Sequence, residues 1–223
     1  MTVLSSNQIK ERLFRENPRD PERIFVTPTP KSSQIKDASI DLVLGNYFIV
    51  TKTAKFSILD ASEDVSERNI NSYQEKVFIP FDEYLVLHPG TFVLGVTWQY
   101  IGLPSNIYAQ VFSRSTWGRA GLTVATAVSI HPSFCGCLTL ELVNNGNAPL
   151  ALHPGSRIAQ IVFFETEARE EDSPISVSTY CGMTEPDFSK LHKEYEELQA
   201  WEKIGKRISF KKVKQKLNRK TFT

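Results

Sequence analysis

The chain has 223 residues, of which 41% are hydrophobic and 23% are charged, and its formal net charge is +1. This composition excludes a disordered or fibrous chain, and no apolar run reaches the roughly 18 residues of a membrane-spanning helix. The N-terminus lacks the basic flank and apolar stretch of a signal peptide. Three cysteines are few and odd in number, which is typical of a reducing compartment, so we expect a cytoplasmic protein.

The order of predicted elements indicates a mainly β fold. A short helix is predicted at 6–15, because Ser5–Gln8 has the spacing of a capping box and the apolar residues that follow share one helical face. From 38 to 164, short β-type runs alternate with Pro-Gly and Asn-Gly turn signals. The predicted strands are 47–51, 76–79, 84–87, 91–96, 107–112, 138–143 and 158–164. A C-terminal helix is predicted at 189–202, so the expected fold is a sandwich or barrel of jelly-roll type with one short helix at each end.

A strongly basic segment ends the sequence. Nine of the 26 Lys and Arg residues, and none of the 25 Asp and Glu residues, lie in 203–220, so the other 17 basic residues share the rest of the chain with all 25 acidic ones. Such a run is ordinarily a solvated helix face or a flexible end. The alternatives are contact with nucleic acid, with a phosphorylated ligand or with an acidic face of a neighbouring subunit. We therefore divide the sequence into a main domain, 1–202, and a basic tail, 203–223.

The segment Ser113–Leu122 gathers two arginines and three hydroxyl side chains around glycines. Guanidinium groups match phosphate oxygens in pairs, and hydroxyl and backbone N–H groups fill the remaining acceptor positions. Gly118 and Gly121 allow the backbone to approach a ligand closely. The pattern predicts a phosphate-binding turn around Arg114, and the alternative is a surface turn whose arginines form ordinary ion pairs.

Two carboxylates lie in strand-like segments. Glu141 alternates with Leu140 and Leu142, so in a half-exposed strand it faces solvent. In a strand buried on both faces it is instead a carboxylate with a shifted pKa and a candidate general base. Asp41 lies in a strand-like run that ends at Gly45, where capping a turn or pairing with an arginine is the expected role.

The sequence lacks the usual zinc and nucleotide-binding fingerprints. Cys135 and Cys137 are isolated, with no second cysteine pair. His192 and Glu194 reproduce half of the zinc-deaminase signature, but no Pro-Cys-x-x-Cys follows them. P-loop and dinucleotide-binding glycine patterns are absent. We therefore expect no zinc site.

Six segments carry a further signal, because they follow one another with characteristic gaps. They are 3–10, 38–48, 87–104, 113–122, 135–144 and 157–163. The fourth resembles the motif Arg-Ser-Ser-x-x-Arg-x-Gly-Leu, and the fifth resembles a strand that carries a catalytic glutamate. Taken together, they resemble the dCTP deaminase branch of the trimeric dUTPase-like superfamily, over most of residues 1–165.

The resemblance implies a jelly-roll-like homotrimer with nucleotide sites between subunits, and deamination of dCTP to dUTP and ammonia without zinc. Glu141 corresponds to the base that takes a proton from the attacking water. Ser115 and Arg119 correspond to groups that orient the water, the cytosine and Glu141. Magnesium accompanies the triphosphate. The residues that the resemblance assigns to nucleotide binding are Arg114, Ser115, Thr116, Ala127, Val128, Ser129, His131, Gln160 and Tyr180.

The loop between the arginine motif and the glutamate strand departs from the family pattern. The stretch 122–132 is one residue shorter than usual, Ser129 stands at a common arginine position, and His131 stands at an aspartate position. In dUTPases that aspartate activates the attacking water, so His131 argues against dUTP hydrolysis. The glycine-rich closing motif of dUTPases is missing, and the closing pattern of the deaminases is matched only in part, at Tyr180 and at Lys193, Tyr195 and Gln199.

Two alternatives therefore stand beside dCTP deamination. One is pyrophosphohydrolysis of dUTP or dCTP, alone or coupled to deamination. The other is a regulatory protein that binds a deoxynucleotide without turning it over. Product formation and ligand-dependent thermal stabilisation distinguish the three.

Overall fold

The computed structural model describes residues 2–17, 19–55, 59, 70, 72–124, 129–167 and 182–190. They fall into two units, one comprising Met1–Thr51 with Glu75–Asp187 and the other Lys52–Gln74 with Phe188–Thr223. In the second unit the Lys52 backbone N–H donates to the Tyr73 carbonyl at 2.6 Å, which joins the ends of the 52–74 segment. The helix predicted at 189–202, beyond its first two residues, and the basic tail lie outside the described residues. No helix in the described ranges is long and apolar enough to cross a membrane.

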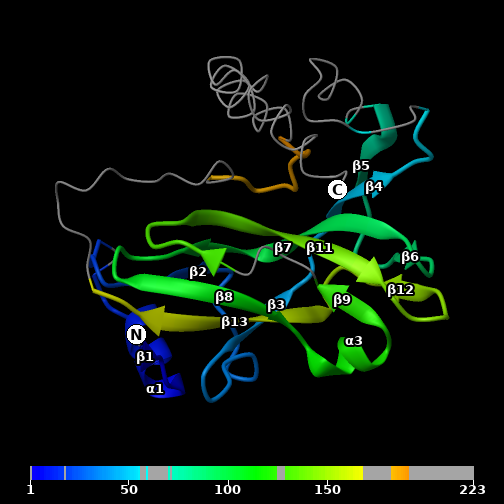
Figure 1. Cartoon of the computed structure of the whole chain (residues 1–223). Coiled ribbons are helices and arrows are strands. Elements are labelled where there is room, and N and C mark those ends of the chain that lie inside the picture. The colour runs from blue at the N-terminus through cyan, green and yellow to red at the C-terminus, as the bar shows by residue number, and fades with distance from the viewer. Residues whose placement is uncertain are drawn as a thin grey trace, which may run out of the picture. The chain divides into compact units, whose positions relative to one another are not determined.

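The described chain is built almost entirely from antiparallel strands (Figure 1). One sheet has the order β1-β13-β8-β10, with β3 also paired to β13, and the second has the order β5-β4-β7-β11-β9, with β2 also paired to β7. Strands β6 and β12 form a separate pair. The strands are β1 (Thr2–Val3), β2 (Phe25–Thr27), β3 (Ile40–Val43), β4 (Tyr47–Thr51), β5 (Gln74–Phe78), β6 (Leu85–Leu87), β7 (Phe92–Gly102), β8 (Ile107–Ser113), β9 (Leu122–Val124), β10 (Ser129–Ile130), β11 (Cys135–Asn144), β12 (Leu150–Leu152) and β13 (Arg157–Glu165). The helices include α1 (Ser6–Leu13) and α3 (Ser115–Arg119).

The two large sheets are held together by one hydrophobic core. Leu140 and Leu142 of β11, with Ile161 and Phe163 of β13, are fully buried members of the same cluster. Burying each such side chain contributes roughly 1.5–3 kcal/mol, so this shared face contributes substantially to the stability of the sandwich. The predicted mainly β fold is confirmed.

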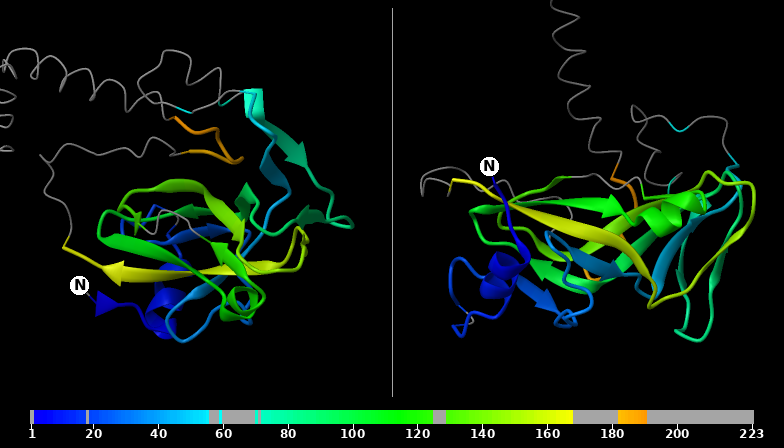
Figure 2. Two further views of the ribbon diagram at one scale, coloured as in Figure 1. Left: turned by 45° about the vertical axis from the view of Figure 1, so that its right-hand side comes forward. Right: turned by 90° about the horizontal axis from the view of Figure 1, so that it is seen from below.

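The N-terminal helix forms as predicted, although it ends two residues early. Ser5 and Gln8 make the reciprocal capping box, and the Phe14 N–H closes the last turn on the Lys10 carbonyl. The buried face includes Arg12, whose guanidinium pairs with Glu165 at the end of β13. Figure 2 shows α1 beside the end of β13, where this ion pair fixes it.

Strand β7 is longer than the predicted 91–96 because polar residues inside it are satisfied rather than exposed. Thr97 and Gln99 are 1% and 2% exposed. The Thr97 hydroxyl donates to the Gln99 carbonyl at 2.8 Å and accepts from the Leu138 N–H at 2.9 Å, where the register of β11 against β7 shifts. The Gln99 amide oxygen accepts from the Val43 N–H at 2.9 Å. These polar positions interrupt the apolar pattern, although the strand continues through them.

Three His-Pro turns share one backbone geometry, and one of them is strained. In each, the fourth residue donates to the carbonyl of the histidine, at 3.1 Å for His88 and His153 and 3.2 Å for His131. The third residue has φ of 72° at Gly90 and 89° at Gly155, but 65° at Ser133. Positive φ costs a residue with a Cβ about 1–2 kcal/mol, so the turn that contains His131 stores strain.

Replacing Ser133 by glycine should therefore stabilise the protein. We expect Ser133→Gly to raise the free energy of unfolding by about 0.5–1 kcal/mol, after allowance for the greater entropy of glycine in the unfolded chain. Gly90→Ser is the reverse control, because a Cβ at Gly90 meets no atom within 4 Å and only the backbone strain is introduced. Urea unfolding midpoints measure both variants. A Ser133→Gly protein no more stable than the wild type would contradict the argument.

Candidate active site

Asp41 and Arg114 are brought together by three neighbouring strands. Gln160 of β13 pairs with Asp41 on one side and with Phe112 of β8 on the other. Arg114 follows β8, and its Nε lies 3.4 Å from Asp41 Oδ1, while Arg157 Nη1 lies 3.3 Å from Asp41 Oδ2. Asp41 is 1% exposed. The expected pairing of Asp41 with an arginine is confirmed, and Arg157 joins the pair.

The segment after Arg114 forms one turn of helix, α3, rather than an open turn. Its placement comes from tertiary contacts: Trp117 Nε1 and Arg114 Nη1 both donate to the Arg157 carbonyl, at 3.0 and 3.2 Å. Ser115, Thr116 and Arg119 are exposed on this helix. The hydroxyls and the second arginine of the predicted phosphate-binding segment are therefore available to a ligand.

A contact between two glycines fixes α3 to the end of β11. An added Cβ at Gly121, whose φ is +96°, would lie 2.5 Å from the Gly146 Cα and 2.6 Å from its N. The Gly121 carbonyl accepts from the Asn145 N–H at 2.8 Å. Asn144 is fully buried, and its Nδ2 donates to the Leu87 and Ala148 carbonyls, both at 2.8 Å. The sequence identified 145–147 only as a turn signal, although this turn positions the arginine segment.

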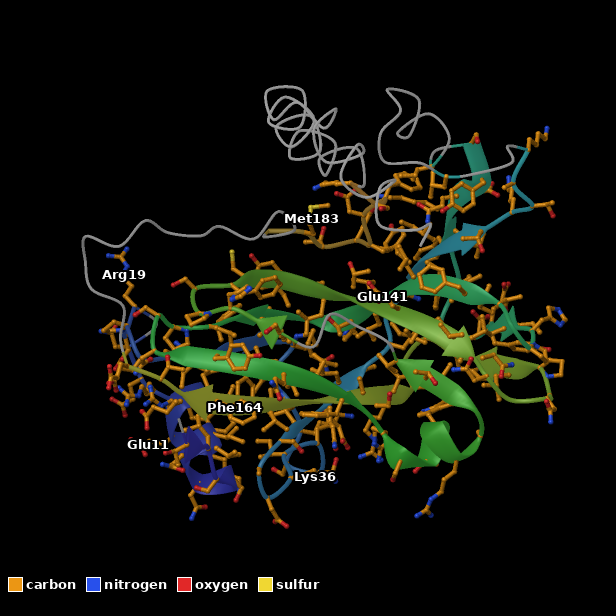
Figure 3. All side chains as sticks on the ribbon, in the orientation of Figure 1. Glu11, Arg19, Lys36, Glu141, Phe164 and Met183 are labelled. Atoms are coloured by element: carbon orange, nitrogen blue, oxygen red, sulfur yellow. The ribbon has the colours of Figure 1, made fainter. Side chains whose placement is uncertain are left out.

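Glu141 lies on the outer face of β11, where its neighbours along and across the strand are largely apolar. It pairs in register with Leu94 of β7, which is 8% exposed. The side chain is half-buried, and burial raises the pKa of its carboxyl. Within the part of the chain that the structure describes, the carboxylate has no hydrogen bond or ion pair. Figure 3 shows Glu141 on the side of β11 turned away from the β8–β13 layer. Glu141 therefore lies between the two situations considered from the sequence, a half-exposed strand and a strand buried on both faces. One face of β11 packs in the core, and the other face, which carries Glu141, is half-covered.

The remaining predicted site residues are divided between described and undescribed positions. Ser129 pairs with Gln110 in β10–β8, and its Oγ lies 2.6 Å from the Tyr108 hydroxyl, which accepts from Gln110 Nε2 at 3.1 Å. His131 is exposed at the start of the strained turn. Ala127, Val128 and Tyr180 lie outside the described residues.

These contacts define two groups of predicted site residues. Arg114, Ser115 and Gln160 lie on or beside the β3–β13–β8 strands, and Glu141 lies on the other sheet. The connection runs through β9, where Val124 pairs with Leu142, the neighbour of Glu141. No hydrogen bond or ion pair between described side chains joins Glu141 to the arginine segment, so the cooperation of Ser115 and Arg119 with Glu141 stays a prediction.

Metal-binding potential within the described residues is small. No group of three His, Cys, Asp or Glu side chains among them could hold a metal ion. Burial raises the pKa of the Cys137 thiol, which disfavours the thiolate form that metals bind.

Comparison with known proteins places the chain in a family. The family model described as dCTP deaminase-like matches residues 3–166. The chain belongs to this family. It is similar to a protein named "dCTP deaminase, dUMP-forming" from Methanosphaera stadtmanae, with 35% identity over 201 residues that cover 88% of this chain and 97% of the relative. It is also similar to a protein named "dCTP deaminase" from Natronomonas pharaonis, with 36% identity over 199 residues covering 87% and 97%.

The fold of the family is shared with a solved structure. The 2'-deoxycytidine 5'-triphosphate deaminase from Agrobacterium tumefaciens superposes with a TM-score of 0.53 at 21% identity, over 73% of this chain and 48% of that longer chain. This likeness supports the mainly β architecture. The family membership inferred from the six sequence segments is confirmed.

Proposed function

We propose that this protein deaminates dCTP, with Glu141 as the general base and without zinc. The observation that carries the proposal is the half-buried carboxylate of Glu141, which has no partner among the described residues and a pKa raised by burial. A structural glutamate in a strand is ordinarily solvated or paired. A carboxylate that is unpaired and only partly solvated, with a raised pKa, is suited to accept and return protons. Relatives named dCTP deaminase supply the substrate class.

The proposed reaction balances with one water molecule. The Glu141 carboxylate accepts a proton from water as the water oxygen bonds to C4 of cytosine, and that proton passes to N3. The second water proton then reaches the amino nitrogen through the same carboxylate. The C4–N bond breaks, ammonia leaves, and the C4–O bond becomes the uracil carbonyl. Glu141 ends the cycle ionised, as it began.

The rest of the proposed site handles the triphosphate. Arg114, Ser115 and Arg119 present cationic and hydroxyl groups that suit phosphate oxygens. Magnesium enters as part of the substrate, bound by those oxygens. We propose that a homotrimer brings the arginine segment of one subunit to Glu141 of its neighbour. Measurement of the molar mass in solution tests the trimer, and the cytoplasmic location stays a prediction.

The nucleotide product has two candidates. Our leading proposal is dUTP, because His131 stands where the family pattern has an aspartate. The second is dUMP, formed when deamination is coupled to pyrophosphate release, because the relative from Methanosphaera stadtmanae is named dUMP-forming.

The test incubates dCTP with magnesium and a zinc-selective chelator and then measures ammonia, dUTP, dUMP and pyrophosphate. Ammonia with dUTP supports the leading proposal, and ammonia with dUMP and pyrophosphate supports the second. Nucleotide binding without ammonia would contradict both and favour a regulatory protein.

The pH profile should show the titration of Glu141. The ionised carboxylate is the reactive form, so kcat/KM should be lost as the pH falls through the pKa of Glu141 in the free enzyme. Because burial raises that pKa, the acidic limb should lie above the range of an ordinary glutamate. Rate measurements at saturating and limiting dCTP locate the limb. An acidic limb at the position of an unperturbed glutamate would contradict the assignment.

A further inference from the structure

Three cations surround one buried carboxylate on the β3–β13–β8 strands. Besides Arg114 and Arg157, Lys36 Nζ lies 3.9 Å from Asp41 Oδ2. The Asp41 side chain is 1% exposed, whereas those of Lys36, Arg114 and Arg157 are 46%, 27% and 42% exposed. The Asp41 carboxylate is thus shielded from solvent, whereas the three cationic side chains are partly exposed to it.

The charges of this cluster do not cancel. Three cations and one carboxylate leave a net charge of about +2 in one small region. Neutralising Asp41 needs only one cation, and holding extra like charges together costs free energy unless an anion compensates them. The excess therefore indicates an anionic ligand that carries more than one negative charge.

The cations are also held in fixed positions by backbone oxygens. The Ser33 carbonyl accepts from Lys36 Nζ at 2.6 Å and from Arg157 Nη1 at 3.4 Å. The Arg157 carbonyl in turn accepts from Arg114 Nη1 at 3.2 Å. Among the described residues, Nη2 of neither arginine has a protein partner. The groups are ordered, while part of each fork stays open to a ligand.

We propose that Lys36, Arg114 and Arg157 form one polyphosphate-binding site, with Asp41 as the residue that orders them. Its ligand is the triphosphate of the nucleotide, and this identity rests on the proposed function. Arg157 and Lys36 are thus binding residues additional to the arginine segment. Fixed guanidinium forks recognise phosphate more strongly than mobile surface charges, because less side-chain entropy is lost on binding.

The test measures binding of inorganic tripolyphosphate to the full-length protein by titration calorimetry, without turnover. Arg157→Gln and Lys36→Gln should each weaken binding by about tenfold to a hundredfold, since each removes a charge-assisted hydrogen bond. Arg157→Lys, which keeps the charge, should recover part of the loss. Arg19→Gln is the matched control, because Arg19 is exposed, makes no side-chain contact among the described residues and lies away from Lys36 (Figure 3).

The same variants separate this site from the proposed reaction. In dCTP turnover, Arg157→Gln and Lys36→Gln should raise KM more than they lower kcat. Tripolyphosphate binding that depends on both residues, in a protein that releases no ammonia, would keep the site and reject the deaminase proposal. Wild-type affinity in the Arg157→Gln and Lys36→Gln proteins would overturn the site, whatever the turnover.

Discussion

Glu141→Gln is expected to lower the rate of ammonia release from dCTP by about 10²–10⁴-fold, the usual contribution of a positioned general acid or base. Glutamine has the same shape and fills the same half-buried position beside Leu94, but it cannot accept a proton from water. Nucleotide binding should persist, because the phosphate groups meet other residues. Ammonia release under single-turnover conditions measures the chemical step, and calorimetry with dCTP measures binding.

The matched control for this variant is Glu83→Gln, since Glu83 is an exposed glutamate outside the site. It should leave the rate of ammonia release unchanged. Turnover of Glu141→Gln at a rate close to that of the wild type would remove Glu141 from its proposed role. A loss in both variants would indicate an effect of net charge rather than of the catalytic carboxylate.

Stability provides an independent readout of the same carboxylate. Burial raises the pKa of Glu141 in the folded protein, so ionisation there is less favourable than in the unfolded chain. The folded state therefore loses stability as the pH rises through the raised pKa. Glu141→Gln should melt at a higher temperature than the wild type at neutral pH, and the difference should disappear in acid. The shift should be small because solvent still screens part of the group.

The strands were predictable because buried and more exposed residues alternate along them. In β11 every second residue from Gly136 to Asn144 is buried, and Glu141 falls between two buried leucines. Alternation fixes which face the glutamate occupies, but it does not fix how far that outer face is covered. The partial burial of Glu141 depends on β7, whose Leu94 lies opposite in a register that no local pattern specifies.

The basic cluster shows a similar limit. From the sequence, the expected role of Asp41 was to cap a turn or to pair with an arginine, and no pattern selected Arg157 or Lys36 as its partners. Arg157 lies 116 residues from Asp41 along the chain, and the two meet because β13, which begins at Arg157, pairs with β3. The available signal was a basic residue directly before a predicted strand, which is too common to identify a site.

The pairing of Gly182 and Met183 with the start of β11 was not predicted, because Cys135 and Cys137 were considered there as possible zinc ligands. The Gly182 N–H donates to the Cys135 carbonyl at 2.6 Å, and the Cys137 N–H donates to the Met183 carbonyl at 2.7 Å. Gly136, between the cysteines, has φ of +148°, and a Cβ there would lie 3.2 Å from the Met183 carbonyl oxygen. The glycine is therefore needed for this segment to lie along β11. In the sequence these residues were considered as a failed zinc motif and as the start of the glutamate-bearing strand, and neither interpretation predicts a further paired segment.

Gly121→Ala is expected to lower the free energy of unfolding by about 2–5 kcal/mol, because two unfavourable effects combine at one atom. The added Cβ would lie 2.5 Å from the Gly146 Cα, which is backbone and has no rotamer by which to move away. The φ of +96° also disfavours any residue with a Cβ. Since native domains are stable by only about 5–15 kcal/mol, the melting temperature should fall markedly.

Gly118→Ala is the matched control for this prediction. A Cβ at Gly118 meets no atom within 4 Å, its φ is ordinary, and the residue lies inside α3. Alanine there should be neutral or stabilising by up to about 1 kcal/mol. Each variant adds one methyl group, and the two positions are three residues apart. Thermal and urea unfolding of both variants therefore separate the effect of the glycine contact from a general effect of alanine. Equal stability of the two would mean that the Gly121–Gly146 contact does not fix the arginine segment to β11. A loss confined to Gly121→Ala would show that the Gly121–Gly146 contact, at the end of the strand that carries Glu141, stabilises the fold.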